Sequence, residues 1–285
     1  MPNIATVIKR FTGLLLVAIL LVKGGYAFAE CESSLELQGA ISVDCCKPID
    51  KCASAGETVY KYMDAIKDDP TVLTIGLQAS PWHLYDQDMR ILPIEELAQM
   101  IRPQLKDPVK RIQLIASWTG VAPERNVKSI AERLSSLLNG FPVSGMDGFL
   151  WVAKDGSLRT TKQAFTVKQK CPYGVNHGEE VMVSLVAGWH IEFGEDYVRN
   201  QNSDGIMRVG AGYDIYMLCQ DKALQAFEAA AKLSNPIAAY NAAMIHLERG
   251  KKNDLAAASS LLSQAAALGD KKAKVMLSEL KQNFP

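Results

Sequence analysis

The chain has 285 residues, in which 31 basic side chains balance 31 acidic ones. A protein without excess positive charge lacks the basic surface that neutralises phosphates, so nucleic acid is not an expected partner. Its hydrophobic content of 48% suits a globular protein with one large domain or two modest ones.

Residues 1–29 have the pattern of a secretory signal peptide. Lys9 and Arg10 precede an uncharged run from Phe11 to Val22, and Ala27-Phe28-Ala29 supplies a small-x-small cleavage site. The run is shorter than the about 20 residues that a transmembrane helix needs, so a retained signal anchor is the less favoured alternative. We therefore expect cleavage after Ala29, a periplasmic mature chain and no stable membrane insertion.

All six cysteines follow the expected cleavage site, and an even number in an exported protein predicts three disulfides. Four lie in a Cys-rich N-terminal segment, residues 30–69, and two lie farther on: Cys31, Cys45, Cys46, Cys52, Cys171 and Cys219. We expect Cys171 to pair with Cys219, although six cysteines allow many connectivities. Adjacent cysteines without a nearby histidine do not match zinc spacings, so no metal site and no cofactor are predicted.

Residues 70–219 are predicted to form an α/β domain. Strand-like and helix-like segments alternate, in the order Thr71–Gln78 (strand), Pro93–Leu105 (helix), Arg111–Ala116 (strand), Val127–Leu138 (helix) and Pro142–Ala153 (strand). Asn126 is the expected cap of the second helix, Asn139-Gly140 its expected end, and Asp155-Gly156 an expected hairpin turn. This alternation indicates parallel strands with covering helices.

The rest of this domain is predicted to be antiparallel. Between Phe165 and Leu218 the expected strands are Val181–Val186, Gly188–Phe193 and Met207–Leu218, with Gly205, Gly210 and Gly212 as turns. The histidines at 177 and 190 fit no compact metal motif, so we expect structural hydrogen bonds from them, and likewise from His246.

Three segments resemble the core of caspase-like cysteine peptidase domains of bacterial toxins: Ile112–Gly120, Ile130–Leu134 and Pro142–Gly145. The resemblance places His83 after the first strand and Ser117-Trp118 where the nucleophilic cysteine would be. It therefore implies a degenerate domain with no catalytic residues. The alternative is a hydrolase in which Ser117 and His83 form a nucleophile–base pair, with Asp86 or Asp88 orienting the histidine.

Four aromatic residues cluster around the carboxyl ends of the predicted strands: Trp82, Tyr85, Trp118 and Trp151. In open α/β sheets this edge forms the ligand crevice. Because Trp and Tyr dominate interface hot spots, we expect Trp82, Tyr85 and Trp118 to contact a protein partner. The alternative is that they fill the core, which we prefer for Trp151.

Residues 220–285 contain an internal repeat. The stretch Ala230–Ala238 returns as Ala265–Ala273, which is typical of stacked helical hairpins. The repeat resembles the Sel1-like, TPR-like family, although Val275 and Met276 stand in the second unit where Tyr240 and Asn241 stand in the first. Such arrays bind proteins, so Tyr240, Asn241 and Met244 are candidate partner contacts. The alternative is an alanine-rich helical bundle with no binding role.

Together these observations predict an α/β middle domain with a parallel-strand core, followed by a small all-α helical repeat that leans on it. Exported Sel1-like repeat proteins resemble immunity proteins that neutralise antibacterial phospholipase effectors of type VI secretion. The resemblance implies a periplasmic protein-binding module with a secreted lipase effector as its partner. Two alternatives are a hydrolase using Ser117 and His83, and an envelope scaffold or signalling adaptor.

Overall fold

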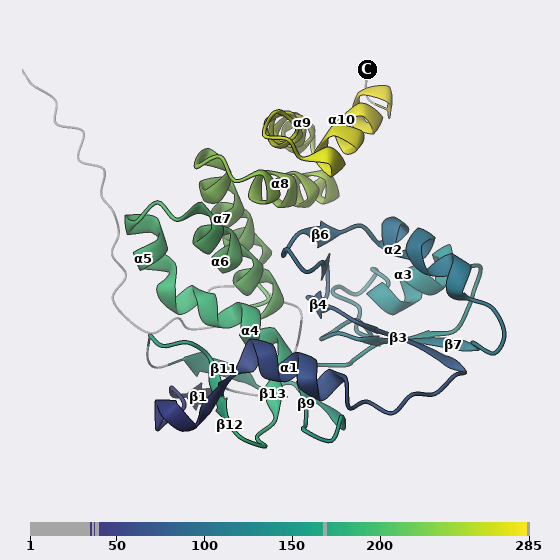
Figure 1. Cartoon of the computed structure of the whole chain (residues 1–285). Coiled ribbons are helices and arrows are strands. Elements are labelled where there is room, and N and C mark those ends of the chain that lie inside the picture. The colour runs from purple at the N-terminus through teal and green to yellow at the C-terminus, as the bar shows by residue number, and fades with distance from the viewer. Residues whose placement is uncertain (1–34, 36, 38–39, 168–169, 284–285) are drawn as a thin grey trace, which may run out of the picture.

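A three-stranded parallel sheet forms the centre of the α/β part (Figure 1). The computed structural model describes residues 35, 37, 40–167 and 170–283, so the expected signal peptide lies outside the described residues. The sheet strands are β3 (Val72–Gly76), β7 (Arg111–Ile115) and β8 (Val143–Ser144), in the order β3-β7-β8. Helices α2 (Ile94–Ile101) and α3 (Ile130–Leu137) share one apolar core with β7. The predicted strand–helix alternation with parallel strands is confirmed.

The two helices of this layer begin at identifiable caps. Pro93 is the N-cap of α2, and a short 3₁₀ turn, η3 (Arg102–Gln104), follows the helix. The N-cap of α3 is Ser129, whose side chain accepts a hydrogen bond from the Glu132 backbone N–H in a reciprocal capping box. The expected cap at Asn126 is therefore wrong by three residues. The helix ends as predicted, with Gly140 at a φ of 82°.

A second sheet is antiparallel and consists of β10 (Leu158–Thr161), β9 (Phe149–Val152) and β13 (Val181–Met182). Its β9–β10 hairpin turns at Asp155-Gly156 as predicted, and Gly156 has a φ of 79°. The single strand expected over Pro142–Ala153 is instead two strands in different sheets. The reason is close backbone packing at Gly145, where a Cβ atom would lie 2.5 Å from Gly120 N. Helix α1 (Ala55–Met63) packs on this sheet.

Short strand pairs complete the α/β part. Strand β1 (Ala40–Val43) runs parallel to β11 (Ala164–Val167). Strand β2 (Cys52–Ser54) pairs antiparallel with β12 (Gly174–Asn176) and follows the 3₁₀ turn η2 (Ile49–Lys51). A small antiparallel sheet, β4 (Gln78–Ala79), β5 (Leu84–Tyr85) and β6 (Ile91–Leu92), faces the helices.

One disulfide joins the N-terminal segment to the middle of the chain, and another lies within that segment. Cys45 is bonded to Cys171 and Cys46 to Cys52. The predicted Cys171–Cys219 pair is wrong, because the pairing of β2 with β12 brings Cys171 beside the N-terminal cysteines. Cys219 is also disulfide-bonded, and Cys31 lies outside the described residues.

The helical part begins at residue 183, well before the expected boundary at 220. The expected strand Val181–Val186 begins as the antiparallel strand β13, but beyond Met182 the predicted strands are wrong. The chain there forms α4 (Val183–Gly188), the 3₁₀ helix η4 (Trp189–Phe193), α5 (Gly194–Arg199) and α6 (Ser203–Ile215). The glycines expected to mark turns are instead points of close packing. A Cβ at Gly205 would lie 2.4 Å from the Tyr197 ring, and one at Gly210 would lie 2.6 Å from Phe227.

The C-terminal helices form two stacked hairpins, as the repeat predicts. The first is α7 (Gln220–Lys232) with α8 (Pro236–Arg249), and the second is α9 (Lys252–Ala267) with α10 (Lys271–Asn283). Asn235 caps α8 through its side chain, and Gly250 ends it with a φ of 63°. In Figure 1, α6 and α7 lie beside each other, α8 lies above β6, and α9 and α10 stand farthest from the sheets. No helix in the described ranges is long and apolar enough to cross a membrane.

Candidate functional site

The site is built around His83, which a tight turn places between β4 and β5. The Ser80 hydroxyl accepts hydrogen bonds from the backbone N–H groups of Trp82, at 3.2 Å, and His83, at 3.0 Å. The backbone N–H of Ser80 donates in return to the carbonyl of His83 at 2.9 Å. This turn fixes the imidazole at the boundary between the α/β part and the helices.

Both ring nitrogens of His83 are hydrogen-bonded to carboxylates from the helical part. Nδ1 lies 2.8 Å from Oδ2 of Asp214 on α6, and Nε2 lies 2.8 Å from Oε2 of Glu248 on α8. The Tyr85 hydroxyl also donates to Asp214 Oδ2, at 2.8 Å. His83 and Asp214 are buried, whereas the side chain of Glu248 is 41% exposed. This His83 cluster (His83, Asp214, Glu248 and Tyr85) joins three segments that are distant in sequence.

The protonation of the cluster follows from its surroundings. Burial alone lowers the pKa of His83, but the charges of Glu248 and Asp214 and their hydrogen bonds outweigh it and raise the pKa to about 10. Burial, followed by the charge of Asp214, raises the pKa of Tyr85 well above its usual value. At neutral pH the cluster therefore holds a cationic imidazolium, with both N–H groups donating, and a neutral phenol.

Ser117 lies outside this cluster. Its hydroxyl is buried and accepts hydrogen bonds from the backbone N–H of Leu150, at 3.0 Å, and from the Ser184 hydroxyl, at 2.7 Å. The imidazolium of His83 has no free lone pair with which to accept the Ser117 proton. The expected orienter Asp86 instead accepts backbone N–H bonds within the β5–β6 turn, from Asp88 and Arg90.

Four of the six expected partner contacts are buried: Tyr85, Trp118, Tyr240 and Asn241. Asn241 binds the β5–β6 hairpin, because its Oδ1 accepts from Ile91 N and its Nδ2 donates to Met89 O, both at 2.8 Å. The guanidinium of Arg90 lies 4.9 Å from the centre of the Tyr240 ring. Burial removes these four side chains from the contact surface, and the first repeat unit instead holds a hairpin of its own chain.

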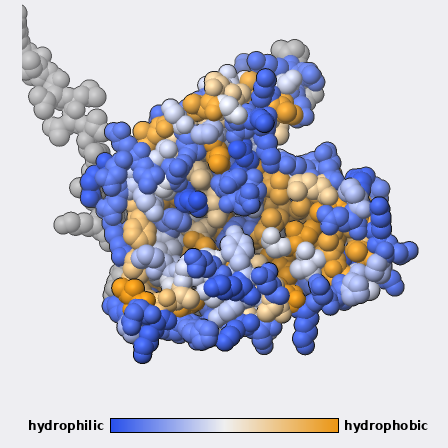
Figure 2. All heavy atoms as spheres, in the orientation of Figure 1, coloured by the Kyte–Doolittle hydropathy of each residue, from blue (hydrophilic) through white to orange (hydrophobic). Residues whose placement is uncertain are grey.

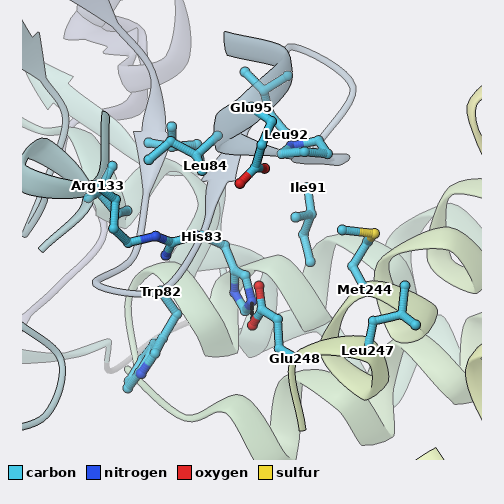
Figure 3. A pocket seen from close by; sticks show the side chains of 13 residues that line it. Trp82, His83, Leu84, Ile91, Leu92, Glu95, Arg133, Met244, Leu247 and Glu248 are labelled. Atoms are coloured by element: carbon cyan, nitrogen blue, oxygen red, sulfur yellow. Dashed lines mark hydrogen bonds and ion pairs between the residues drawn. The ribbon is translucent and has the colours of Figure 1, made fainter. Parts of the chain in front are cut away.

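The other two expected contacts, Trp82 and Met244, line one pocket beside His83 (Figure 3). This His83 pocket has a volume of about 270 Å³. Its walls come from both parts of the chain: Trp82, Glu95 and Arg133 from the α/β part, and Met244, Leu247 and Glu248 from α8. Figure 2 shows apolar atoms gathered over the neighbouring α/β surface, where α2, α3 and β3 lie in Figure 1.

A larger groove of about 480 Å³ lies between α2 and α10. Its lining includes Glu96 and Gln99 on α2, and Val275 and Met276 on α10. Ion pairs hold its two sides together: Lys272 Nζ lies 2.8 Å from Glu96 Oε1, and Arg90 pairs with Asp270 at the start of α10.

The remaining histidines make hydrogen bonds to neighbouring side chains. His177 bonds Lys154, His190 bonds the Tyr197 hydroxyl, and His246 lies between Glu228 and Asp254. Burial, with a smaller contribution from Arg208, lowers the pKa of His190 to about 4. Within the described ranges, no group of three or more His, Cys, Asp or Glu side chains could hold a metal ion.

Comparison with known proteins gives one match. The model of a family described as "Domain of unknown function (DUF8616)" matches residues 49–160. The matched stretch runs from η2 to β10 and contains both His83 and Ser117, whereas Asp214, Glu248 and the helical part lie beyond it. No curated protein and no solved structure matches the chain.

Proposed function

We propose that this chain is an exported protein-binding module of the immunity type, whose partner is a secreted antibacterial effector of the phospholipase class. The observation that supports it best is a difference between the two helical hairpins. Tyr240 and Asn241 of the first hairpin are buried against the chain's own β5–β6 hairpin. Val275 and Met276, at the corresponding positions of the second, line the open groove between α2 and α10.

The groove has the chemistry of a protein contact. Val275 is 59% exposed on α10, and charged residues flank the apolar side chains at the rim. An apolar centre within a polar rim is the usual arrangement of a protein interface. The ion pairs between α10 and the α/β part keep the groove in one shape, which lowers the entropy cost of binding.

The state of the His83 cluster favours binding over hydrolysis. A protonated histidine with both N–H groups donating to carboxylates cannot act as a general base. The disulfides Cys45–Cys171 and Cys46–Cys52 suit an oxidising compartment, which agrees with export.

The experiment is a protection assay in cells that produce a candidate lipase-type effector in the periplasm. Wild type is expected to restore growth and to form a complex with the effector. Val275→Asp places a charge among the apolar side chains that line the groove and is expected to weaken binding by tenfold or more. Val198→Asp is the matched control, because Val198 is 62% exposed on α5, outside the groove.

Two results would contradict the proposal. If no effector is bound, or if Val275→Asp binds and protects as well as Val198→Asp, the groove is not the contact surface. A complex with an envelope-assembly protein in place of an effector would favour the scaffold alternative.

A further inference from the structure

The His83 pocket presents three kinds of chemistry in one small space. Its far end is apolar, with Ile91, Met244 and Leu247 as neighbours. In Figure 3 the carboxylates of Glu95 and Glu248 point into the pocket from opposite walls, and Arg133 reaches in from the end near Trp82. A cation, two carboxylates and an apolar surface therefore line the same cavity.

Two of the three charges that face the pocket are not neutralised by their neighbours, whereas Glu248 is ion-paired with His83. Within the described part of the chain, neither the Arg133 guanidinium nor the Glu95 carboxylate has a hydrogen-bond or ion-pair partner, and Arg133 is half-buried. Glu248 accepts from His83 through Oε2, and its carboxylate lies at the pocket wall in Figure 3. The imidazolium holds the Glu248 carboxylate in position rather than closing the site.

We propose that this pocket binds a free apolar α-amino acid. Arg133 pairs with the ligand carboxylate, Glu95 and Glu248 Oε1 accept from the ligand ammonium, and the ligand side chain packs against Met244 and Leu247. A guanidinium matches a carboxylate through two parallel N–H donors. A zwitterion pairs with Arg133 and with Glu95 at once, whereas an anion or a cation alone leaves one of the two without a partner.

The size of the pocket supports a small ligand. Its volume of about 270 Å³ falls just below the usual range of about 300–1,000 Å³ for sites that take drug-sized molecules. Trp82 and the aliphatic side chains line the pocket, whereas Glu95 and Glu248 lie on its exposed side, so solvent screens part of the charge attraction.

The experiment is calorimetric titration of the full mature chain with three probes. These are L-leucine, L-leucinamide, which lacks the carboxylate, and N-acetyl-L-leucine, which lacks the ammonium. Leucine is expected to bind, and each analogue is expected to bind about tenfold more weakly or worse, because each leaves one charged wall group unpaired.

The variants assign the two charges separately. Arg133→Gln is expected to abolish the preference for leucine over leucinamide and to keep the preference over N-acetyl-leucine, and Glu95→Gln is expected to show the opposite pattern. Arg125→Gln is the control, because Arg125 is an exposed arginine outside the pocket. Thermal unfolding of each variant verifies that it is folded.

Absence of leucine binding at millimolar concentration overturns the proposal. So does an Arg133→Gln variant that discriminates between the probes as wild type does. This test does not depend on the effector, so its failure leaves the proposed protein-binding function in place.

Discussion

The His83 cluster should make a large and pH-dependent contribution to stability, and His83→Gln tests this. The substitution leaves Asp214 buried opposite an uncharged side chain. Removing one partner of a buried ion pair typically costs about 3–5 kcal/mol. The rise in the pKa of His83 from 6.5 to about 10 corresponds to about 5 kcal/mol at 1.36 kcal/mol per pKa unit. Glu248 is partly exposed, so solvent screens its part of the charge attraction to His83. We therefore expect His83→Gln to lower the free energy of unfolding by about 3 kcal/mol.

The sign of the pH dependence follows from the direction of the shift. The pKa of His83 is higher in the folded than in the unfolded chain, so its stabilisation is complete below about pH 6.5 and disappears as the pH rises through about 10. The free-energy gap between wild type and His83→Gln should therefore be largest near pH 6. It should shrink by about 2 kcal/mol or more by about pH 9.5.

Urea unfolding with the disulfides intact, followed by circular dichroism at several pH values, measures both quantities. His177→Gln is the control, because His177 is exposed and bonds only Lys154 among the described residues. Taking the difference between variant and wild type cancels the lysines and tyrosines that titrate in both. The difference in unfolding free energy between wild type and His83→Gln could be below about 1 kcal/mol near pH 6, or constant up to about pH 9.5. Either result would refute the conclusion that His83 is cationic in the folded chain.

Two pairs of local substitutions test the packing and the capping. Gly188→Ala should destabilise the chain by about 1–3 kcal/mol in urea unfolding, because its Cβ would overlap the Tyr216 ring. Gly56→Ala is the control: the nearest neighbour of its Cβ would lie at 3.7 Å, so it should be neutral or stabilise the chain by up to about 1 kcal/mol. Equal effects of the two would contradict the helix packing. Ser129→Ala should cost about 1 kcal/mol and Asn126→Ala less than about 0.5 kcal/mol in the same assay, and the reverse order would place the cap at Asn126.

The parts of the fold that the sequence predicts are those set by local patterns. The spacing of Ile94, Leu97, Ala98 and Ile101 specifies the apolar face of α2, and all four are buried. The sequence also contains a signal for the start of α3, because Ser129 is followed three residues later by Glu132, which is the pattern of a capping box. Asn126 was a weaker signal, since it has no such reciprocal partner.

The misassigned region has an ambiguous pattern. Val181–Val186 is a short apolar run rich in β-branched residues, and periodicity cannot separate a buried strand from a buried helix over that length. Tertiary packing decides that helices form here, because Gly188, Gly210 and Gly212 allow α4, α6 and α7 to approach closely. A glycine needed for helix contact has the same sequence signature as a glycine in a turn.

The candidate site could be predicted only in part, because its partners are distant in sequence. Trp82 and His83 were recognised as candidates, but the carboxylates that bind the imidazole are 131 and 165 residues away, at Asp214 and Glu248. No local motif connects these positions. The pairing depends on how the helical part docks onto the β5–β6 hairpin, which involves the buried contacts of Asn241.

The two proposed sites are adjacent, and this has a measurable consequence. Pro93 and Glu95, at the start of α2, line both the His83 pocket and the groove between α2 and α10. A ligand ammonium bound to Glu95 would change the charge that the groove presents, so leucine should alter the affinity for the effector. Thermodynamic linkage then requires the effector to alter the affinity for leucine by the same factor. Titrating effector into the chain with and without saturating leucine, and leucine into the chain with and without effector, measures both factors. An effector affinity that leucine leaves unchanged, or a change that persists in Glu95→Gln, would show that the two sites are not coupled through this residue.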